Sequence, residues 1–284
     1  MLTFFTSSTE HLKPLINTAC ADYEVKQFSD GELYVKVHED VAKKDVWIIT
    51  STPAPSENFF ELFFLLNALM RTGVQKINII FTYFGYARQS IAQKGEANCA
   101  QVICDFLKMF PLAKTYVLHV HAAPVMHNLL HFTDIIDMSF FCDVAKDYDA
   151  IAAPDKGAVD FAQKIADAAH KDIVFVEKMR PAQEEVKIES IDGNVVGKKI
   201  LLVDDIIATG NTITKSAQAL LSCGAAEVSA AATHGTLSDD ACCRLTSSLL
   251  NKIYVTNSVH QKSCGKIVVK DISSFIESVV LQEL

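Results

Sequence analysis

The sequence predicts an α/β protein in which two domains each fold as a mainly parallel sheet flanked by helices. Short runs rich in Val, Ile and Leu alternate with helical patterns over most of the chain, and this alternation is typical of parallel strands covered by helices. The length of 284 residues is enough for two modest domains, each with its own core. The two halves meet near residues 143–148 without a linker rich in Pro, Gly or Ser.

The individual elements follow from the period of the apolar residues. The predicted strands are 45–50, 76–82, 115–120, 149–153, 173–177, 198–204, 227–233 and 252–255. The predicted helices are, in order, about 57–72, 98–109, 156–169, 212–223 and 272–283.

The helix predicted at 57–72 is apolar around almost its whole circumference. Phe59, Leu62 and Phe63 lie on one side, and Phe60 and Phe64 on the other. A helix of this kind is buried on all sides. Two interpretations stay open: the helix lies deep in one domain, or its second face packs on another subunit.

The charge pattern argues against nucleic acid and membrane as partners. The formal net charge is −8, whereas binding to nucleic acid or to an anionic membrane surface needs a basic face. The first residues lack the basic region of a signal peptide. The most apolar stretch, 62–70, is too short to span a bilayer. We therefore expect a cytoplasmic protein.

The cysteines predict reduced, mostly buried thiols. None of the possible pairs has the CxxC spacing of a metal or redox motif, and in a chain of this length such thiols are typical of a cytosolic protein. The eight cysteines are at positions 20, 99, 104, 142, 223, 242, 243 and 264.

The stretch KILLVDDIIATGNTIT, residues 199–214, combines three features. An apolar run predicts a buried strand whose C-terminal edge carries Asp204 and Asp205, and open α/β sheets bind ligands at that edge. A short loop then leads into a helix, so that backbone N–H groups and two hydroxyls form a phosphate site. The carboxylates suit the hydroxyls of a sugar or a hydrated Mg²⁺. On these residues alone, a plain strand–turn–helix with a solvated acidic pair stays open as the alternative.

A family resemblance favours the sugar-phosphate interpretation. The two acidic residues and the Thr-Gly-x-Thr loop resemble the signature of type I phosphoribosyltransferases and ribose-phosphate pyrophosphokinases. Phe28-Ser-Asp-Gly-Glu32 and Phe84-Gly-Tyr-Ala-Arg-Gln89 resemble segments found in the pyrophosphokinases and not in the transferases. The resemblance runs from about residue 28 to 278 and is closer to the shorter archaeal-type enzymes. It implies two tandem type I phosphoribosyltransferase-like domains, a pyrophosphokinase domain at 1–145 and a phosphoribosyltransferase-like domain at 146–284.

The resemblance also implies roles for individual residues. Lys178 and Arg180 match the Lys-x-Arg pair of a mobile catalytic loop, where two cations would stabilise the transferred diphosphoryl group. The residues implied for ATP are Phe28, Asp30, Gly31, Glu32, Arg88 and Gln89. The residues implied for ribose 5-phosphate are Asp204, Asp205, Ala208, Thr209, Gly210, Asn211 and Thr212.

The implied cofactor is Mg²⁺, with His121 and Asp155 as its ligands. His119 stands where the family often has Asp, which removes one hard oxygen ligand. A structural zinc site built from His119, His121, His127 and His131 is the weaker alternative, because no acidic or Cys partner has suitable spacing. The segment after Gln89 keeps Lys94 as its only cation, which puts phosphate contacts from that loop in doubt.

The predicted function is therefore a Mg²⁺-dependent ribose-phosphate pyrophosphokinase. Its substrates would be ATP and ribose 5-phosphate, and the family works as homo-oligomers with ATP sites shared between subunits. Two other functions stay open. A type I phosphoribosyltransferase would share the loop at 204–212, and a non-catalytic regulatory paralogue would keep the fold without the chemistry.

Overall fold

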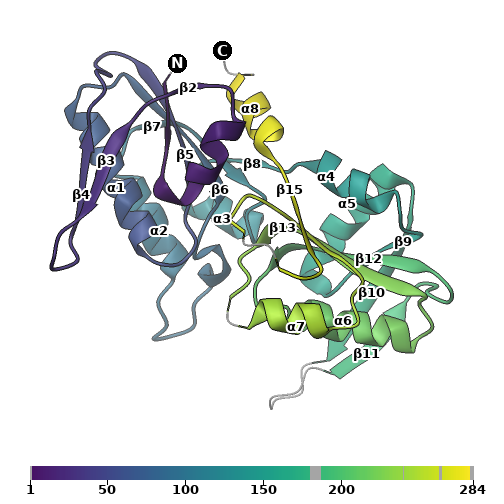
Figure 1. Ribbon diagram of the computed structural model, residues 1–284. Helices are drawn as coiled ribbons and strands as arrows, with labels where there is room; N and C mark the ends of the chain where they lie inside the picture. Colours follow the sequence, from purple (N-terminus) through teal and green to yellow (C-terminus); the bar gives the residue numbers. More distant parts are fainter. Residues whose placement is uncertain (1, 180–186, 239, 262–263, 282–284) are drawn as a thin grey trace. The chain divides into compact units, whose positions relative to one another are not determined.

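The computed structural model describes residues 2–179, 187–238, 240–261 and 264–281, and it divides into two compact units. The first unit comprises Met1–Ile136, Ser258–His260 and Ile272–Leu284, and the second comprises Asp137–Asn257 and Gln261–Asp271. Figure 1 gives the order of the elements along the chain. Each unit is described by itself.

The division differs from the predicted boundary between residues 145 and 146. Helix α4 (Met138–Ala145) belongs to the second unit because Phe140 and Phe141 pack into its core. The C-terminal helix α8 (Ser273–Leu281) belongs to the first unit, where Ile276 and Val280 join a core cluster with Trp47. The polypeptide therefore returns to its first unit at the end, which an even split of the sequence misses.

The first unit contains a parallel sheet of six strands. Its order is β2-β1-β5-β6-β7-β8. The central strands β5 (Asp45–Ser51) and β6 (Lys76–Tyr83) are almost entirely buried, as their runs of Ile, Val and Phe require. The outer strands are β1 (Leu2–Phe5), β2 (Ala19–Cys20), β7 (Leu112–Leu118) and β8 (Thr133–Ile135).

An antiparallel hairpin, β3 (Tyr23–Gln27) and β4 (Leu33–Val37), forms a separate two-stranded sheet in the same unit. The other elements are the 3-10 helices η1 (Ser7–Leu15) and η2 (Ala87–Gln89) and the helices α1 (Glu57–Arg71), α2 (Cys99–Leu107) and α3 (Ala123–Leu129).

Helix α1 buries one face and exposes the other. Leu62, Leu65 and Leu66 are fully buried, whereas Phe60 is 53% exposed and Phe64 is 40% exposed. The interpretation that the helix lies deep within its own domain is therefore wrong for this chain. Packing on another subunit stays a prediction.

The second unit contains seven strands in the order β11-β10-β9-β12-β13-β14-β15, all parallel except the β10–β11 pair. Its strands are β9 (Ala150–Ala153), β10 (Asp172–Met179), β11 (Lys187–Asp192), β12 (Lys199–Ile207), β13 (Glu227–Gly235), β14 (Ile253–Thr256) and β15 (Ile267–Lys270). Besides α4, its helices are η3 (Lys156–Ala158), α5 (Val159–Ala169), α6 (Asn211–Ser222) and α7 (Ala241–Ser247).

The predicted α/β class with mainly parallel sheets is confirmed. All eight predicted strands and all five predicted helices are present. The strands that the sequence did not predict are short or lie at sheet edges, where the apolar pattern is weak. Within the described residues, no helix has the length and hydropathy needed to cross a membrane.

The cysteines differ from the prediction. Cys242 and Cys264 form a disulfide bond, with their Cα atoms 6.2 Å apart. Of the other six, Cys104 is buried and the rest are partly or fully exposed. The prediction of reduced, mostly buried thiols was therefore wrong. It rested on spacing along the chain, which shows neither which thiols meet in the fold nor which lie at the surface.

Candidate active site

The loop between β12 and α6 has the form that the sequence predicts for a phosphate site. Strand β12 ends at Ile207 and helix α6 begins at Asn211, so only three residues connect them. Gly210 has φ +77° and accepts the first helical hydrogen bond, from Thr214 N at 3.0 Å. No side chain caps this helix at Gly210. Its first N–H groups and its positive dipole end can therefore bind an anion.

Two acidic residues precede this loop inside the strand. Asp204 and Asp205 lie within β12, which runs three residues beyond its predicted end, and both are partly exposed. The Asp205 N–H donates to Asp204 Oδ1 at 2.9 Å. Burial raises the pKa of the Asp204 carboxyl well above its usual range, and the neighbouring carboxylates of Asp205 and Asp155 raise it further.

Asp155 joins the same cluster of negative charge. It precedes η3, where its Oδ1 accepts a hydrogen bond from Gly157 N at 3.1 Å. The mutual repulsion of three carboxylates is relieved by a cation or by hydroxyl donors. Mg²⁺ prefers hard oxygen ligands and keeps several waters, so these carboxylates fit the predicted cofactor. Among the described residues, no three His, Cys, Asp or Glu side chains are grouped as a complete metal site.

Helix α7 lies directly behind the loop. Arg244 Nη1 donates to Thr209 O at 2.5 Å, and a Cβ on Gly210 would lie 2.8 Å from Leu245 Cδ2. Figure 1 shows α6 and α7 next to each other. The sequence analysis missed Arg244, because nothing in the sequence near it indicates a contact with a loop 35 residues earlier.

The predicted catalytic pair is only partly described. The backbone of Lys178 lies in β10, opposite Ile188 of β11, next to an irregularity in register between Glu177 and Lys178. The sequence placed Lys178 in a loop beyond a strand ending at 177, and that placement was wrong because the strand continues to Met179. Arg180 lies outside the described residues.

The predicted ATP segment at 28–32 forms the tip of the β3–β4 hairpin. Phe28 N donates to Glu32 O at 2.8 Å, and Glu32 N donates to Asp30 Oδ1 at 3.1 Å. Gly31 has φ +95°, a conformation that favours glycine. Phe28 is 53% exposed and meets Tyr34 edge to face, with ring centroids 6.0 Å apart. The tip thus presents an aromatic ring on which a base can stack.

The second ATP segment forms η2, just after β6. A Cβ on Gly85 would lie 2.0 Å from Thr52 O, so this position accepts only glycine. Tyr86 then takes a left-handed conformation with φ +64°. These two residues turn the chain so that Arg88 and Gln89 are exposed, free of core packing. Both ATP segments belong to the first unit.

The loop after β7 contains the predicted metal ligand His121. His119 is buried in a left-handed conformation, with φ +41°, and its N–H donates to Ile135 O at 2.8 Å. His121 follows it as an exposed residue of the first unit, whereas Asp155 belongs to the second. His127 stacks on Phe132 with ring centroids 4.2 Å apart.

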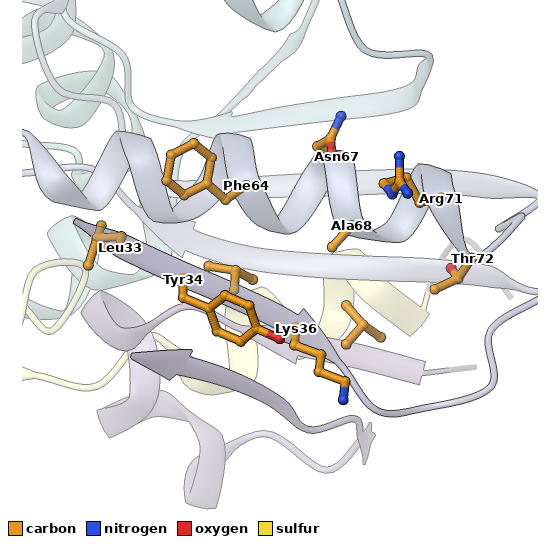
Figure 2. A pocket seen from close by; sticks show the side chains of 10 residues that line it. Leu33, Tyr34, Lys36, Phe64, Asn67, Ala68, Arg71 and Thr72 are labelled. Atoms are coloured by element: carbon orange, nitrogen blue, oxygen red, sulfur yellow. The ribbon is translucent and has the colours of Figure 1, made fainter. Parts of the chain in front are cut away.

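A pocket also lies beside the ATP-segment hairpin, between β4 and α1. Tyr34 and Lys36 line it from the strand, and Asn67 and Arg71 line it from the helix. Figure 2 shows that the polar ends of these side chains do not converge on one point. The pocket includes none of the predicted site residues.

Comparison with known proteins identifies the family. The profile for the N-terminal domain of ribose phosphate pyrophosphokinase matches residues 6–110, and the phosphoribosyl transferase domain profile matches residues 130–261. The ribose-phosphate pyrophosphokinase of Bacillus caldolyticus is 35% identical over 86% of this chain and 81% of its own length. That of Corynebacterium ammoniagenes is 33% identical over 96% of this chain and 89% of its own.

A solved structure agrees over the whole chain. The phosphoribosylpyrophosphate synthetase from Mycobacterium smegmatis matches with a TM-score of 0.89 and 26% sequence identity, covering 100% of this chain and 99% of that one. These findings confirm the predicted pair of phosphoribosyltransferase-like domains. The chain belongs to the ribose-phosphate pyrophosphokinase family.

Proposed function

We propose that this chain transfers the β,γ-diphosphoryl group of ATP to the 1-hydroxyl of ribose 5-phosphate, giving 5-phosphoribosyl 1-diphosphate and AMP. The observation that carries the proposal is the β12–α6 segment, where two carboxylates precede a helix N-terminus whose N-cap residue, Gly210, has no side chain to cap it. A ligand with a phosphate and adjacent hydroxyls complements both parts. Family membership supports the same reaction.

Ribose 5-phosphate is assigned to the second unit. Asp204 and Asp205 would accept hydrogen bonds from the ribose hydroxyls, and the N–H groups and hydroxyls of residues 208–212 would bind the 5-phosphate. This arrangement holds the sugar at both ends and orients its anomeric hydroxyl. Positioning of this kind, with stabilisation of charge, supplies most of the catalysis in phosphoryl transfer.

ATP is assigned to the two segments of the first unit. Phe28 would stack on the adenine, and Asp30, Gly31 and Glu32 would shape the hairpin tip around it. Arg88 offers a planar cationic fork for phosphate, and Gln89 can bind a base or a phosphate.

Lys178 and Arg180 are the proposed catalytic residues. Their positive charges would stabilise the negative charge that spreads over the transferred group and the leaving AMP. Mg²⁺ is the proposed cofactor, with His121 and Asp155 each assigned as a ligand by its motif. When bound, the ion would neutralise phosphate charge.

Assembly and location are also proposals. The exposed Phe60 and Phe64 of α1 support a homo-oligomer, because an apolar face of this kind is covered when subunits associate. A cytoplasmic location would supply ATP and Mg²⁺ to the enzyme.

The reaction is tested by its nucleotide product. Purified protein with ATP, Mg²⁺ and ribose 5-phosphate is expected to release AMP, measured by chromatography, with one 5-phosphoribosyl diphosphate formed per AMP. Release of ADP instead, or no turnover with any divalent cation, would contradict the proposal. The second outcome would favour a non-catalytic paralogue.

The catalytic role of Lys178 is tested by Lys178→Ala. Loss of one preorganised charge is expected to lower kcat by about 100-fold or more, because the interaction forms in the transition state. The affinity for ATP, measured by calorimetry, is expected to stay within about threefold of the wild-type value. An equal loss of turnover and ATP affinity would remove the catalytic assignment.

A further inference from the structure

The contact between Arg244 and the phosphate loop links a helix outside the predicted site to the proposed substrate. Arg244 is partly buried on α7, and its Nη1 donates to the backbone carbonyl oxygen of Thr209 at 2.5 Å. Both residues belong to the second unit. Hydrogen bonds that involve a charged donor are shorter and stronger than neutral ones.

This bond fixes the orientation of one peptide group in the loop. The Thr209–Gly210 peptide is trans, since the only cis peptide bond in the described residues is Ala54–Pro55. In a trans peptide group, the carbonyl and the N–H point to opposite sides. With Thr209 O held toward Arg244, the Gly210 N–H must point away from the guanidinium. A reversed peptide would turn the carbonyl oxygen toward a bound phosphate, and the two would repel each other.

Leu245, which follows Arg244 on α7, packs against Gly210, which follows Thr209 in the loop. Leu245 is fully buried and lies so close to Gly210 that a Cβ there would be 2.8 Å from Leu245 Cδ2. Leu245 and Ala241 share a core cluster with Ile207 and Ile213, which flank the loop on β12 and α6. The helix behind the loop is therefore held by the same core that holds the strand and helix on either side of it.

We propose that Arg244 is a positioning residue for ribose 5-phosphate: it holds the Thr209–Gly210 peptide in the orientation that binds the 5-phosphate. It acts through the loop backbone. The guanidinium also places a positive charge next to the loop. This charge would attract a phosphate, whereas the carboxylates of Asp204, Asp205 and Asp155 would repel it. The inference rests on the proposed assignment of residues 208–212 to the phosphate.

The test separates substrate affinity from turnover. Arg244→Met keeps much of the side-chain volume and removes both charge and donor. It is expected to raise the KM for ribose 5-phosphate by about 10- to 100-fold, the range for losing a charged hydrogen bond. The KM for ATP, and kcat at saturating ribose 5-phosphate, are expected to change by less than about threefold. Arg244→Lys keeps a charged donor. On a logarithmic scale, its KM for ribose 5-phosphate is expected to lie closer to the wild-type value than to the Arg244→Met value.

Lys252→Met is the matched control. Lys252 is an exposed cation immediately before β14, so in a parallel sheet it lies at the edge opposite the C-terminal ends of the strands. The Lys252→Met variant is expected to have wild-type KM values for ribose 5-phosphate and for ATP. The proposal is overturned if Arg244→Met leaves the KM for ribose 5-phosphate unchanged, or if it lowers kcat and both affinities together. If Arg244→Met does not fold, Arg244→Gln, which also removes the charge, takes its place, and an unchanged KM for ribose 5-phosphate in that variant overturns the proposal.

Failure of this inference is distinguishable from failure of the proposed function. Wild-type protein that forms AMP while Arg244→Met shows no selective effect would contradict the role of Arg244 alone. Wild-type protein that binds no ribose 5-phosphate in calorimetry and forms no AMP would contradict the proposed function, and the inference with it.

Discussion

At the scale of single residues, the carboxylates of β12 show a conflict between stability and the proposed function. The pKa of the Asp204 carboxyl is raised by its burial and by the negative charges of Asp205 and Asp155. Strain of this kind persists at functional sites because the rest of the fold supports it. The sequence identified both acidic residues. Only the fold shows that Asp155, about 50 positions earlier in the chain, adds to their repulsion.

Asp204→Asn is expected to stabilise the protein in a pH-dependent way. The pKa of Asp204 is higher in the folded protein than in the unfolded chain. The contribution of this carboxyl to stability is therefore complete below about pH 4, and it is lost as the pH rises through the folded-state pKa. In EDTA, the variant should therefore melt about 2–5 °C above wild type at pH 8 and close to wild type at pH 4. Scanning calorimetry across this range measures the difference.

The same variant should lose at least about tenfold in turnover, because the proposed ribose contact needs a charged acceptor. Asp147→Asn, an exposed change in the same unit, serves as the control. An Asp204→Asn variant that is less stable than wild type at pH 8 would contradict the interpretation of this cluster.

At the scale of elements, β12, the loop and α6 were predictable because the pattern is local. A buried apolar run, small residues and helical spacing follow one another between Lys199 and Ser222, and each determines its own piece of backbone. Helix α7 lacked such a signal. Its seven residues are too few for a clear period, and its importance comes from contacts with Thr209 and Gly210.

The disulfide between Cys242 of α7 and Cys264 is expected to change the number of titratable thiols. Unfolded protein that has not been reduced should react with about six equivalents of Ellman's reagent, and reduced protein with all eight. Closing a loop with a sequence separation of 22 residues stabilises a protein by about 3 kcal/mol, so reduction should also lower the melting temperature. Eight reactive thiols before reduction would contradict the pairing.

At the scale of the whole molecule, the chain has two mainly parallel sheets, and the C-terminal helix belongs to the first unit. The sequence predicted the class and the number of domains. It did not predict that α8 packs into the core of the first unit. The apolar residues of a terminal helix do not indicate which of two cores they join.

The exposed face of α1 predicts the assembly state. Phe60 and Phe64 have ring centroids 6.2 Å apart and form an apolar patch on the described chain. Changing both to Ser is expected to lower the molar mass measured by light scattering, since the subunit contact would lose two aromatic anchors. Leu249→Ser, at a residue 65% exposed in the second unit, should leave the mass unchanged. A wild-type protein that is a monomer at micromolar concentration would contradict the prediction.

The amino-acid sequence alone was sufficient for the α/β class, the order of the main strands and helices, and the segments that match the ribose-phosphate pyrophosphokinase family. These features depend on residues that are close in the chain, so local periodicity and short motifs define them. Folding in three dimensions was needed for the grouping of Asp155 with Asp204 and Asp205, the contact of Arg244 with Thr209, the pairing of Cys242 with Cys264, and the exposed face of α1. Each of these depends on contacts between distant segments, which only the packing of the folded chain brings together.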